Sequence, residues 1–243
     1  ASDGTLTSDS STITVTVTSV NDVPVAADKS VTTAEDTAAT VTMSATDIES
    51  DALTYSIVAT PDNGTLGSVS GATVVYTPST NYNGFDTFTY KVTDANNGVS
   101  NIATVTMTVT AVNDVPTTDN GSVTTAEDTA VNVTLNASDV DGDALTYAVG
   151  TATNGTVTVS GNTATYTPNA HFNGTDSFTF TASDGTLTSD SSTITVTVTA
   201  VNDIPVANDI TVTTAEDTEV TITLSATDVE DSTFTFAAVE LPD

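Results

Sequence analysis

The 243-residue chain has no cysteine and no tryptophan, a single histidine and only two basic residues, Lys29 and Lys91. Without cysteine there is no disulfide framework and no thiolate zinc site of the usual kind. The chain also lacks an apolar run long enough to cross a bilayer, and a basic segment followed by an apolar one that would indicate a signal peptide. We therefore expect no membrane insertion in this segment, and we expect the targeting information to lie elsewhere.

Basic charge is scarce against 32 aspartate and glutamate residues, so the formal net charge is −30. This balance excludes nucleic acid and anionic membrane surfaces as favourable partners. A compact chain with so much charge of one sign repels itself unless high salt or bound divalent cations neutralise it. Composition alone therefore makes Ca²⁺ the first candidate cofactor.

Sequence markers recur in register and define a repeat of about 90 residues. VNDVP begins at residues 20 and 112 and VNDIP at 201, while TTAEDT begins at 32, 124 and 213. We therefore divide the chain into a C-terminal part of a repeat at 1–19, full repeats at 20–111 and 112–200, and an N-terminal part of a repeat at 201–243. Neither partial repeat is expected to bury a core alone.

Within a repeat, apolar residues alternate with threonine, as in TVTMTVT at 104–110, and Asn-Gly turns separate the short runs. This period of two predicts half-buried β-strands with threonine facing outward. In the first full repeat we expect seven strands, near 29–34, 39–46, 53–59, 65–69, 73–77, 86–93 and 100–111. Seven short strands in this length are typical of an immunoglobulin-like β-sandwich. We expect the aromatic residues of the strands to form its core: Tyr55, Tyr76, Phe88, Tyr90, Tyr147, Tyr166, Phe178 and Phe180.

Acidic and amide side chains also return at equivalent places. Each AEDT segment contributes one glutamate: Glu35, Glu127 and Glu216. A loop after the second expected strand contributes three acids per repeat: Asp47, Glu49 and Asp51; Asp139, Asp141 and Asp143; Asp228, Glu230 and Asp231. A later turn contributes Asp3, Asp94 and Asp184. The VND segment contributes Asn21 with Asp22, Asn113 with Asp114, and Asn202 with Asp203.

These motifs resemble cadherin repeats, specifically the bacterial cadherin-like domains strung in large numbers along giant surface adhesins. The resemblance covers essentially the whole chain. It implies an all-β fold of tandem seven-stranded Greek-key immunoglobulin/cadherin-like β-sandwiches, with Ca²⁺ bridging successive domains. It also implies that the junction between the full repeats is built from Glu35 on the first repeat, the linker pair Asn113 and Asp114, and acids of the second: Asp139, Asp141, Asp143 and Asp184.

Two departures from the family pattern reduce the expected number of ions. The first Asp of the family's linker is replaced by Ser19, Ala111 and Ala200, and its last Asn by Val23, Val115 and Ile204. The family's LDRE segment is absent, and the turn in its place offers only Asp86 or Asp176 as a candidate ligand. We therefore expect one or two ions per junction rather than three.

Calcium takes six to eight oxygen ligands in irregular geometry, as clustered loop carboxylates can provide. An EF-hand is excluded, because Ala144 and Gly150 stand where its loop needs glycine and glutamate. The alternative is that the acids are solvated and cap turns, as aspartate commonly does. For the aspartates that follow the AEDT glutamate, a ligand and a turn role stay open: Asp36, Asp128 and Asp217.

The sequence contains no recognisable set of catalytic residues. His171 is the only histidine, its counterpart in the first full repeat is Asn81, and we interpret it as a turn position. No Ser, His, Asp set recurs, and carboxylates that repeat at every junction indicate structure. We expect a non-enzymatic protein.

The sequence favours calcium-rigidified extender or stalk repeats of a large secreted bacterial surface adhesin or matrix protein, at the cell surface, which mediate cell adhesion. Calcium and the neighbouring repeats are the expected partners. The alternative is that the repeats themselves associate with other copies into a fibre or bind surface glycans. An exposed aromatic patch would favour that alternative, and the candidates are Tyr82, Phe85 and Phe172.

Overall fold

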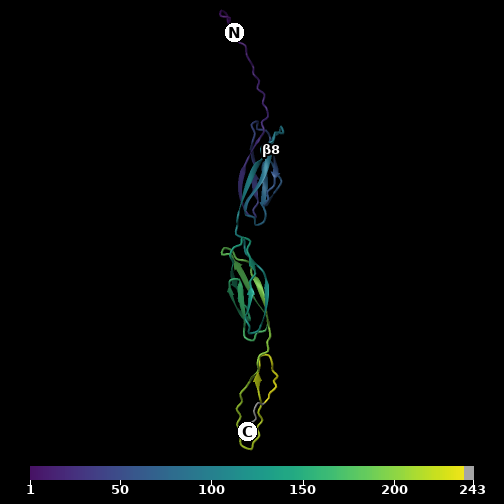
Figure 1. Ribbon diagram of the computed structural model, residues 1–243, viewed down its shortest axis with the longest axis vertical. Coiled ribbons are helices and arrows are strands. Elements are labelled where there is room, and N and C mark those ends of the chain that lie inside the picture. The colour runs from purple at the N-terminus through teal and green to yellow at the C-terminus, as the bar shows by residue number, and fades with distance from the viewer. Residues whose placement is uncertain (238–243) are drawn as a thin grey trace. The chain divides into compact units, whose positions relative to one another are not determined.

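The computed structural model describes residues 1–237, and the chain divides after Val112 into two compact units. Among the described residues no helix is long and apolar enough to cross a bilayer. The described elements are all strands, so the prediction of an all-β fold is confirmed. In Figure 1 the strands around the label β8 run lengthwise through their unit.

The first unit contains a sandwich of nine strands. They are β1 (Val25–Ala27), β2 (Lys29–Ala34), β3 (Ala39–Thr42), β4 (Ser44–Thr46), β5 (Thr54–Ala59), β6 (Gly64–Leu66), β7 (Thr73–Pro78), β8 (Gly84–Thr93) and β9 (Ala103–Thr110). One sheet has the order β2-β9-β8-β5, the other β3-β7-β6, and β1 pairs with β4. The pairing of β2 with β9 is parallel, and the other pairings are antiparallel.

The run 39–46, predicted as one strand, is divided at Met43 into β3 and β4. β3 pairs with β7, whereas β4 pairs with β1, so the chain changes partner at this point. Met43 is 1% exposed and lies in the core. Periodicity cannot show the change, because the alternation of side chains continues through it.

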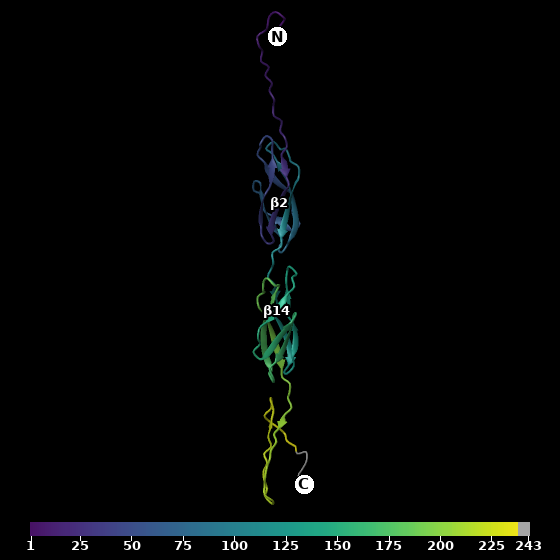
Figure 2. The ribbon, with the colours of Figure 1, turned by 90° about the vertical axis from the view of Figure 1, so that its left-hand side faces the viewer.

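The second unit repeats the plan. Its strands are β10 (Thr117–Thr118), β11 (Gly121–Ala126), β12 (Val131–Thr134), β13 (Ala137–Ser138), β14 (Thr146–Val149), β15 (Gly155–Ser160), β16 (Thr163–Pro168), β17 (Gly174–Ser183) and β18 (Ser192–Thr199). The sheets have the orders β11-β18-β17-β14 and β12-β16-β15, and β10 pairs with β13. Figure 2 labels β2 in the first sandwich and β14 in the second.

The predicted core aromatics are confirmed in both repeats. Six are at most 1% exposed: Tyr76, Phe88, Tyr90, Tyr166, Phe178 and Phe180. Tyr55 and Tyr147 are half-buried against the same clusters. The alternating apolar residues of the strands thus meet between the two sheets, as the period of two requires.

The partial repeats contain little regular structure. Residues 201–237 form only the pair β19 (Val206–Ala207) and β20 (Ala226–Thr227), and residues 1–24 form one isolated bridge between Ser2 and Thr7. The apolar alternation of 12–18 is exposed here, whereas the same sequence is buried in β18. Neither stretch contains the strands that would cover its apolar side chains. The last six residues of the predicted partial repeat, 238–243, lie outside the described residues.

Candidate functional site

The linker at the start of each repeat is held against acidic loops of the same repeat. In the second unit the Asn113 amide donates to Asp184 Oδ2 at 2.8 Å, and the Asp114 amide N–H donates to Asp141 Oδ2 at 2.8 Å. In the first unit Asn21 donates in the same way to Asp94 at 2.9 Å. The structure therefore brings together side chains that the sequence places about 70 residues apart.

The main-chain contact of the linker aspartate recurs in the other repeats. The Asp22 N–H donates to Glu49 Oε2 at 3.1 Å, and the Asp203 N–H donates to Glu230 Oε2 at 3.1 Å. Three copies of one contact indicate that it follows from the repeated sequence.

The acidic loop folds around its first aspartate. Asp139 Oδ1 accepts the N–H groups of Asp141 and Asp143 at 2.9 and 3.4 Å. Two hydrogen bonds of the same type shape the other copies, from the Asp51 N–H to Asp47 and from the Asp231 N–H to Asp228, both at 2.9 Å. These Asx-type turns support the alternative that the acids cap turns. These hydrogen bonds use only the Oδ1 atom of each aspartate. The Oδ2 atoms of Asp47 and Asp139 are buried and have no hydrogen-bond partner.

The AEDT glutamates of the two full repeats are buried, whereas Glu216 is exposed. Glu35 is 4% exposed and Glu127 is 3% exposed. Oε1 of Glu35 accepts the N–H of Val112, and Oε1 of Glu127 accepts that of Val201, so each glutamate holds the chain where it leaves its repeat. Oε2 of each glutamate is buried without a hydrogen-bond partner. An unpartnered buried carboxylate oxygen is costly in free energy, and a bound cation would remove that cost.

The aspartate that follows each glutamate has a turn role. Asp36 and Asp128 have φ angles of 54° and 56°, in the left-handed region that aspartate tolerates. Asp36 Oδ1 accepts the N–H of Asn81, and Asp128 Oδ1 accepts that of His171, both at 3.1 Å. His171 itself has a φ of 56°, so its interpretation as a turn position is confirmed.

Asp86 and Asp176 differ from the other predicted ligands. Asp86 accepts four hydrogen bonds between 2.8 and 3.1 Å, from the N–H groups of Asp62, Asn63 and Thr87 and from the Tyr76 hydroxyl. Asp176 accepts the equivalent four, from Thr153, Asn154, Tyr166 and Ser177. Burial raises the pKa of the Asp176 carboxyl, but these donors outweigh it and the net shift is downward. The structure gives both carboxylates the role of tying an Asn-Gly turn to the sandwich.

Asparagine in the linker lowers the pKa of the carboxyl that it contacts. The Asn113 amide is the main cause of the lowered pKa of Asp184, and the N–H groups of Leu187 and Thr186 add to it. Asn21 has the same effect on Asp94. A depressed carboxyl pKa stabilises the fold above the unfolded-state pKa, and this contribution is lost as the pH falls through the folded-state value.

We expect Asn113→Ala to raise the pKa of Asp184 toward its usual value, because the largest cause of the shift is removed. An NMR titration of the aspartate side chains in chelator would measure this, with the Asp94 resonance as the internal control. An Asp184 pKa that does not change would show that the linker amide is not what holds this carboxylate.

Sequence reasoning missed Asn96. Its Nδ2 donates to Asn21 Oδ1 and to Asp51 Oδ2, both at 2.7 Å, and so joins the linker to the acidic loop. The second repeat has no counterpart, because its turn at Asp184 is shorter. The difference in turn length between the two repeats was the sequence signal that could have indicated the role of Asn96.

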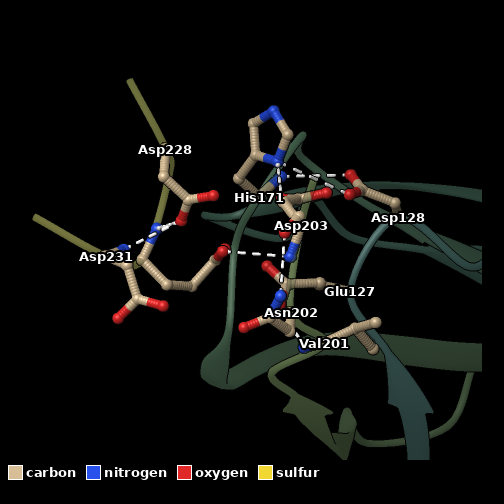
Figure 3. Close-up of polar contacts among 9 residues, drawn as sticks. Glu127, Asp128, His171, Val201, Asn202, Asp203, Asp228 and Asp231 are labelled. Carbon is tan, nitrogen blue, oxygen red and sulfur yellow. Dashed lines mark hydrogen bonds and ion pairs between the residues drawn. The ribbon is translucent and has the colours of Figure 1, made fainter. Parts of the chain in front are cut away.

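Figure 3 shows the acids around the linker at 201–203. Glu127 and Asp128 approach from the second full repeat, while Asp228 and Asp231 lie on a separate segment that follows the linker. The Asp203 carboxylate lies next to His171 and Asp128, whereas Asp228 lies apart from them on its own segment. His171 lies beside Asp203, and its Nδ1 is 2.9 Å from Asp203 Oδ2, a contact that the sequence did not suggest.

Of the three aromatic residues expected as candidates for an exposed patch, two are packed against a core. Tyr82 and Phe172 pack against the two cores. The Tyr82 hydroxyl also donates to the Phe85 carbonyl at 2.6 Å. Phe85 itself is 73% exposed.

Comparison with solved structures gives matches of low sequence identity. A fragment of human protocadherin-24, EC1-2, is 16% identical, with 74% of this chain and 99% of that chain covered and a TM-score of 0.53. The human desmocollin-1 ectodomain is 14% identical over 76% of this chain and 42% of its own, with a TM-score of 0.45. The endo-fucoidan hydrolase MfFcnA4 from glycoside hydrolase family 107 is 24% identical, with 74% of this chain and 29% of that chain covered and a TM-score of 0.33.

The chain thus spans about a third or less of the hydrolases that it matches, and no curated protein matches it. The model of the bacterial Ig domain matches residues 21–110 and again 113–197. This chain belongs to the bacterial Ig domain family, of which it carries two tandem copies, and its fold is that of cadherin-like repeats.

Proposed function

We propose that these repeats bind Ca²⁺ at their linkers and act as calcium-rigidified stalk segments of an extracellular bacterial adhesion protein. The observation that carries the proposal is the set of buried carboxylate oxygens without a hydrogen-bond partner, on Glu35, Asp47, Glu127 and Asp139. They occur at equivalent positions in both repeats. Oxygen atoms in an acidic, irregular setting are what Ca²⁺ requires.

The acids around the linker at 201–203 are candidate ligands of such an ion. The repeat supplies Glu127, the linker supplies Asp203 and the following loop supplies Asp228, and Figure 3 shows the three side chains around the linker. The bound ion would supply positive charge among carboxylates that otherwise repel each other. Since the chain's net charge is −30, neutralising such clusters also favours compact repeats.

Hydrogen bonds within the chain hold the linker in place even without the ion. The linker is short, and its main chain is fixed by Glu127 on one side and Glu230 on the other. Pro205 follows the linker with its φ restricted. Bending of the linker would separate these oxygens, so an ion bound to them would resist bending.

Titration with Ca²⁺ tests the binding. We expect calorimetry to show dissociation constants on the order of 10⁻⁴–10⁻³ M, as in other extracellular modules. Small-angle scattering at constant ionic strength should show a longer maximum dimension in Ca²⁺ than in chelator. Absence of both heat and a melting shift would reject calcium binding. Scattering curves that coincide while Ca²⁺ is bound would reject rigidification alone.

Of the three candidate aromatics for direct glycan binding or self-association, Phe85 is the one that is exposed. One exposed ring is common on soluble proteins and does not form a patch. We therefore propose a mechanical and non-catalytic role.

A further inference from the structure

His171 gives the linker at 201–203 a nitrogen ligand among oxygens. Its Nδ1 lies 2.9 Å from Asp203 Oδ2 and 3.6 Å from Asp128 Oδ2. One ligand atom from each of the three residues lies within 4.8 Å of the other two. In Figure 3 the imidazole ring of His171 and the carboxylates of Asp128 and Asp203 lie close together.

From this geometry we infer a second metal site, formed by His171, Asp128 and Asp203, for a borderline transition-metal ion of the Zn²⁺ class. Zinc takes imidazole nitrogen and carboxylate oxygen at about 2.0–2.2 Å, so ligands at tetrahedral angles lie roughly 3.3–3.5 Å apart. The two measured separations from Nδ1 are on either side of this value. Calcium, in contrast, takes oxygen ligands only.

The backbone positions two of the three ligands before any ion binds. The His171 N–H donates to Asp128 Oδ1, which leaves Asp128 Oδ2 on the side of the imidazole ring. Both residues have left-handed φ angles of 56°, so the two tight turns hold the side chains together. The third ligand, Asp203, belongs to the linker that follows the repeat.

The first full repeat provides the natural comparison. Asn81 occupies the position of His171 there, with the same left-handed backbone at φ 55° and the same bond to the aspartate of the AEDT turn. The first repeat thus retains the turn but offers no imidazole. The exchange of Asn for His changes the candidate ligand atom at this position from an amide oxygen to an imidazole nitrogen. It makes one linker of this chain selective for a different ion.

The site has three protein ligands and exposed surroundings, since the side chains of His171 and Asp128 are 47% and 46% exposed. Water would complete the coordination, and the affinity would be lower than that of a buried four-ligand structural site. Because the ligands come from the repeat and from the linker, the bound ion would fasten the linker to the end of the repeat.

The test is calorimetry of the whole chain with Zn²⁺ in the presence of excess Ca²⁺, so that carboxylate-only sites are filled. We expect binding of one Zn²⁺ and a dissociation constant at least tenfold weaker in His171→Asn, which installs the residue of the first repeat without a change of turn. NMR reports the same event, because the ring protons of the only histidine should shift further when Zn²⁺ is added to the Ca²⁺-saturated chain.

Two further variants separate ligation from charge. Asp203→Asn should weaken Zn²⁺ binding, whereas Asp190→Asn, an equal charge change at an exposed aspartate of the same repeat, should not. Zinc affinity that is unchanged in His171→Asn, or no zinc binding by the parent chain, would overturn the inference. The inference shares Asp203 with the proposed calcium set, but histidine-dependent Zn²⁺ binding without Ca²⁺ binding would reject the proposed function and leave this site standing.

Discussion

Replacing Glu127 by glutamine is expected to change stability in opposite directions with and without calcium. In chelator, the variant removes a buried carboxylate whose Oε2 has no hydrogen-bond partner, so we expect a gain of about 1 kcal/mol. The amide oxygen can still accept the Val201 N–H, so the end of the repeat stays in place. In Ca²⁺, the variant loses a ligand and the linked stabilisation, about 2.7 kcal/mol when the ion is present at roughly 100 times its dissociation constant.

Thermal unfolding in chelator and in Ca²⁺ measures both effects on one pair of samples. Glu219→Gln serves as the control, because it makes the same charge change at an exposed glutamate in the next copy of the repeat. We expect the control to behave as the parent in both conditions. A Glu127→Gln variant that is less stable than the parent by the same amount with and without Ca²⁺ would mean that the glutamate has a structural role only.

Removing the carboxylate of Asp176 is expected to destabilise the second repeat by about 3–5 kcal/mol, regardless of calcium. In Asp176→Ala, three main-chain N–H groups and the Tyr166 hydroxyl lose their acceptor at a position that is 6% exposed. Each unsatisfied buried donor costs on the order of 1–3 kcal/mol, and relaxation and water recover part of the sum. Urea unfolding in chelator and in Ca²⁺ should give the same loss.

Tyr166→Phe is the matched variant for the same cluster. It removes one donor and keeps the ring in the core, so we expect a loss of about 1 kcal/mol. A loss in Asp176→Ala that appears only in Ca²⁺ would return Asp176 to the set of metal ligands. The predictions for Glu127 and Asp176 therefore separate the acids that we propose as ion ligands from those whose oxygens already accept hydrogen bonds.

Much of the fold follows from the sequence because its signals are local. The alternation in β9 and β18 requires one buried and one solvent-facing side, and the Asn-Gly turns end the strands at short intervals. The aromatic residues of β7, β8, β16 and β17 are the largest side chains buried between the sheets. Repetition of the markers then defines the second sandwich once the first is recognised.

The resemblance to cadherin repeats implied that linker residues and acids of the following repeat lie at one junction. In the structure Asn113 lies beside Asp184 and Asp114 beside Asp141. The number and positions of bound ions stay predictions. They depend on which carboxylate oxygens are already used by hydrogen bonds, and the residue type does not reveal that.

Only the tertiary structure decided the role of chemically identical residues. Asp139 and Asp176 are both aspartates near a turn, yet Asp139 has a buried oxygen without a hydrogen-bond partner and Asp176 has four donors. The donors of Asp176 come partly from the strand that carries Tyr166 and from the turn at Asn154, and neither contact can be read from the motif. In the same way, His171 meets Asp203 because the fold closes its repeat next to the linker, 32 residues along the chain. Local pattern fixes strands and turns, whereas the partners of a polar side chain are fixed by segments that meet only after the two sheets have packed.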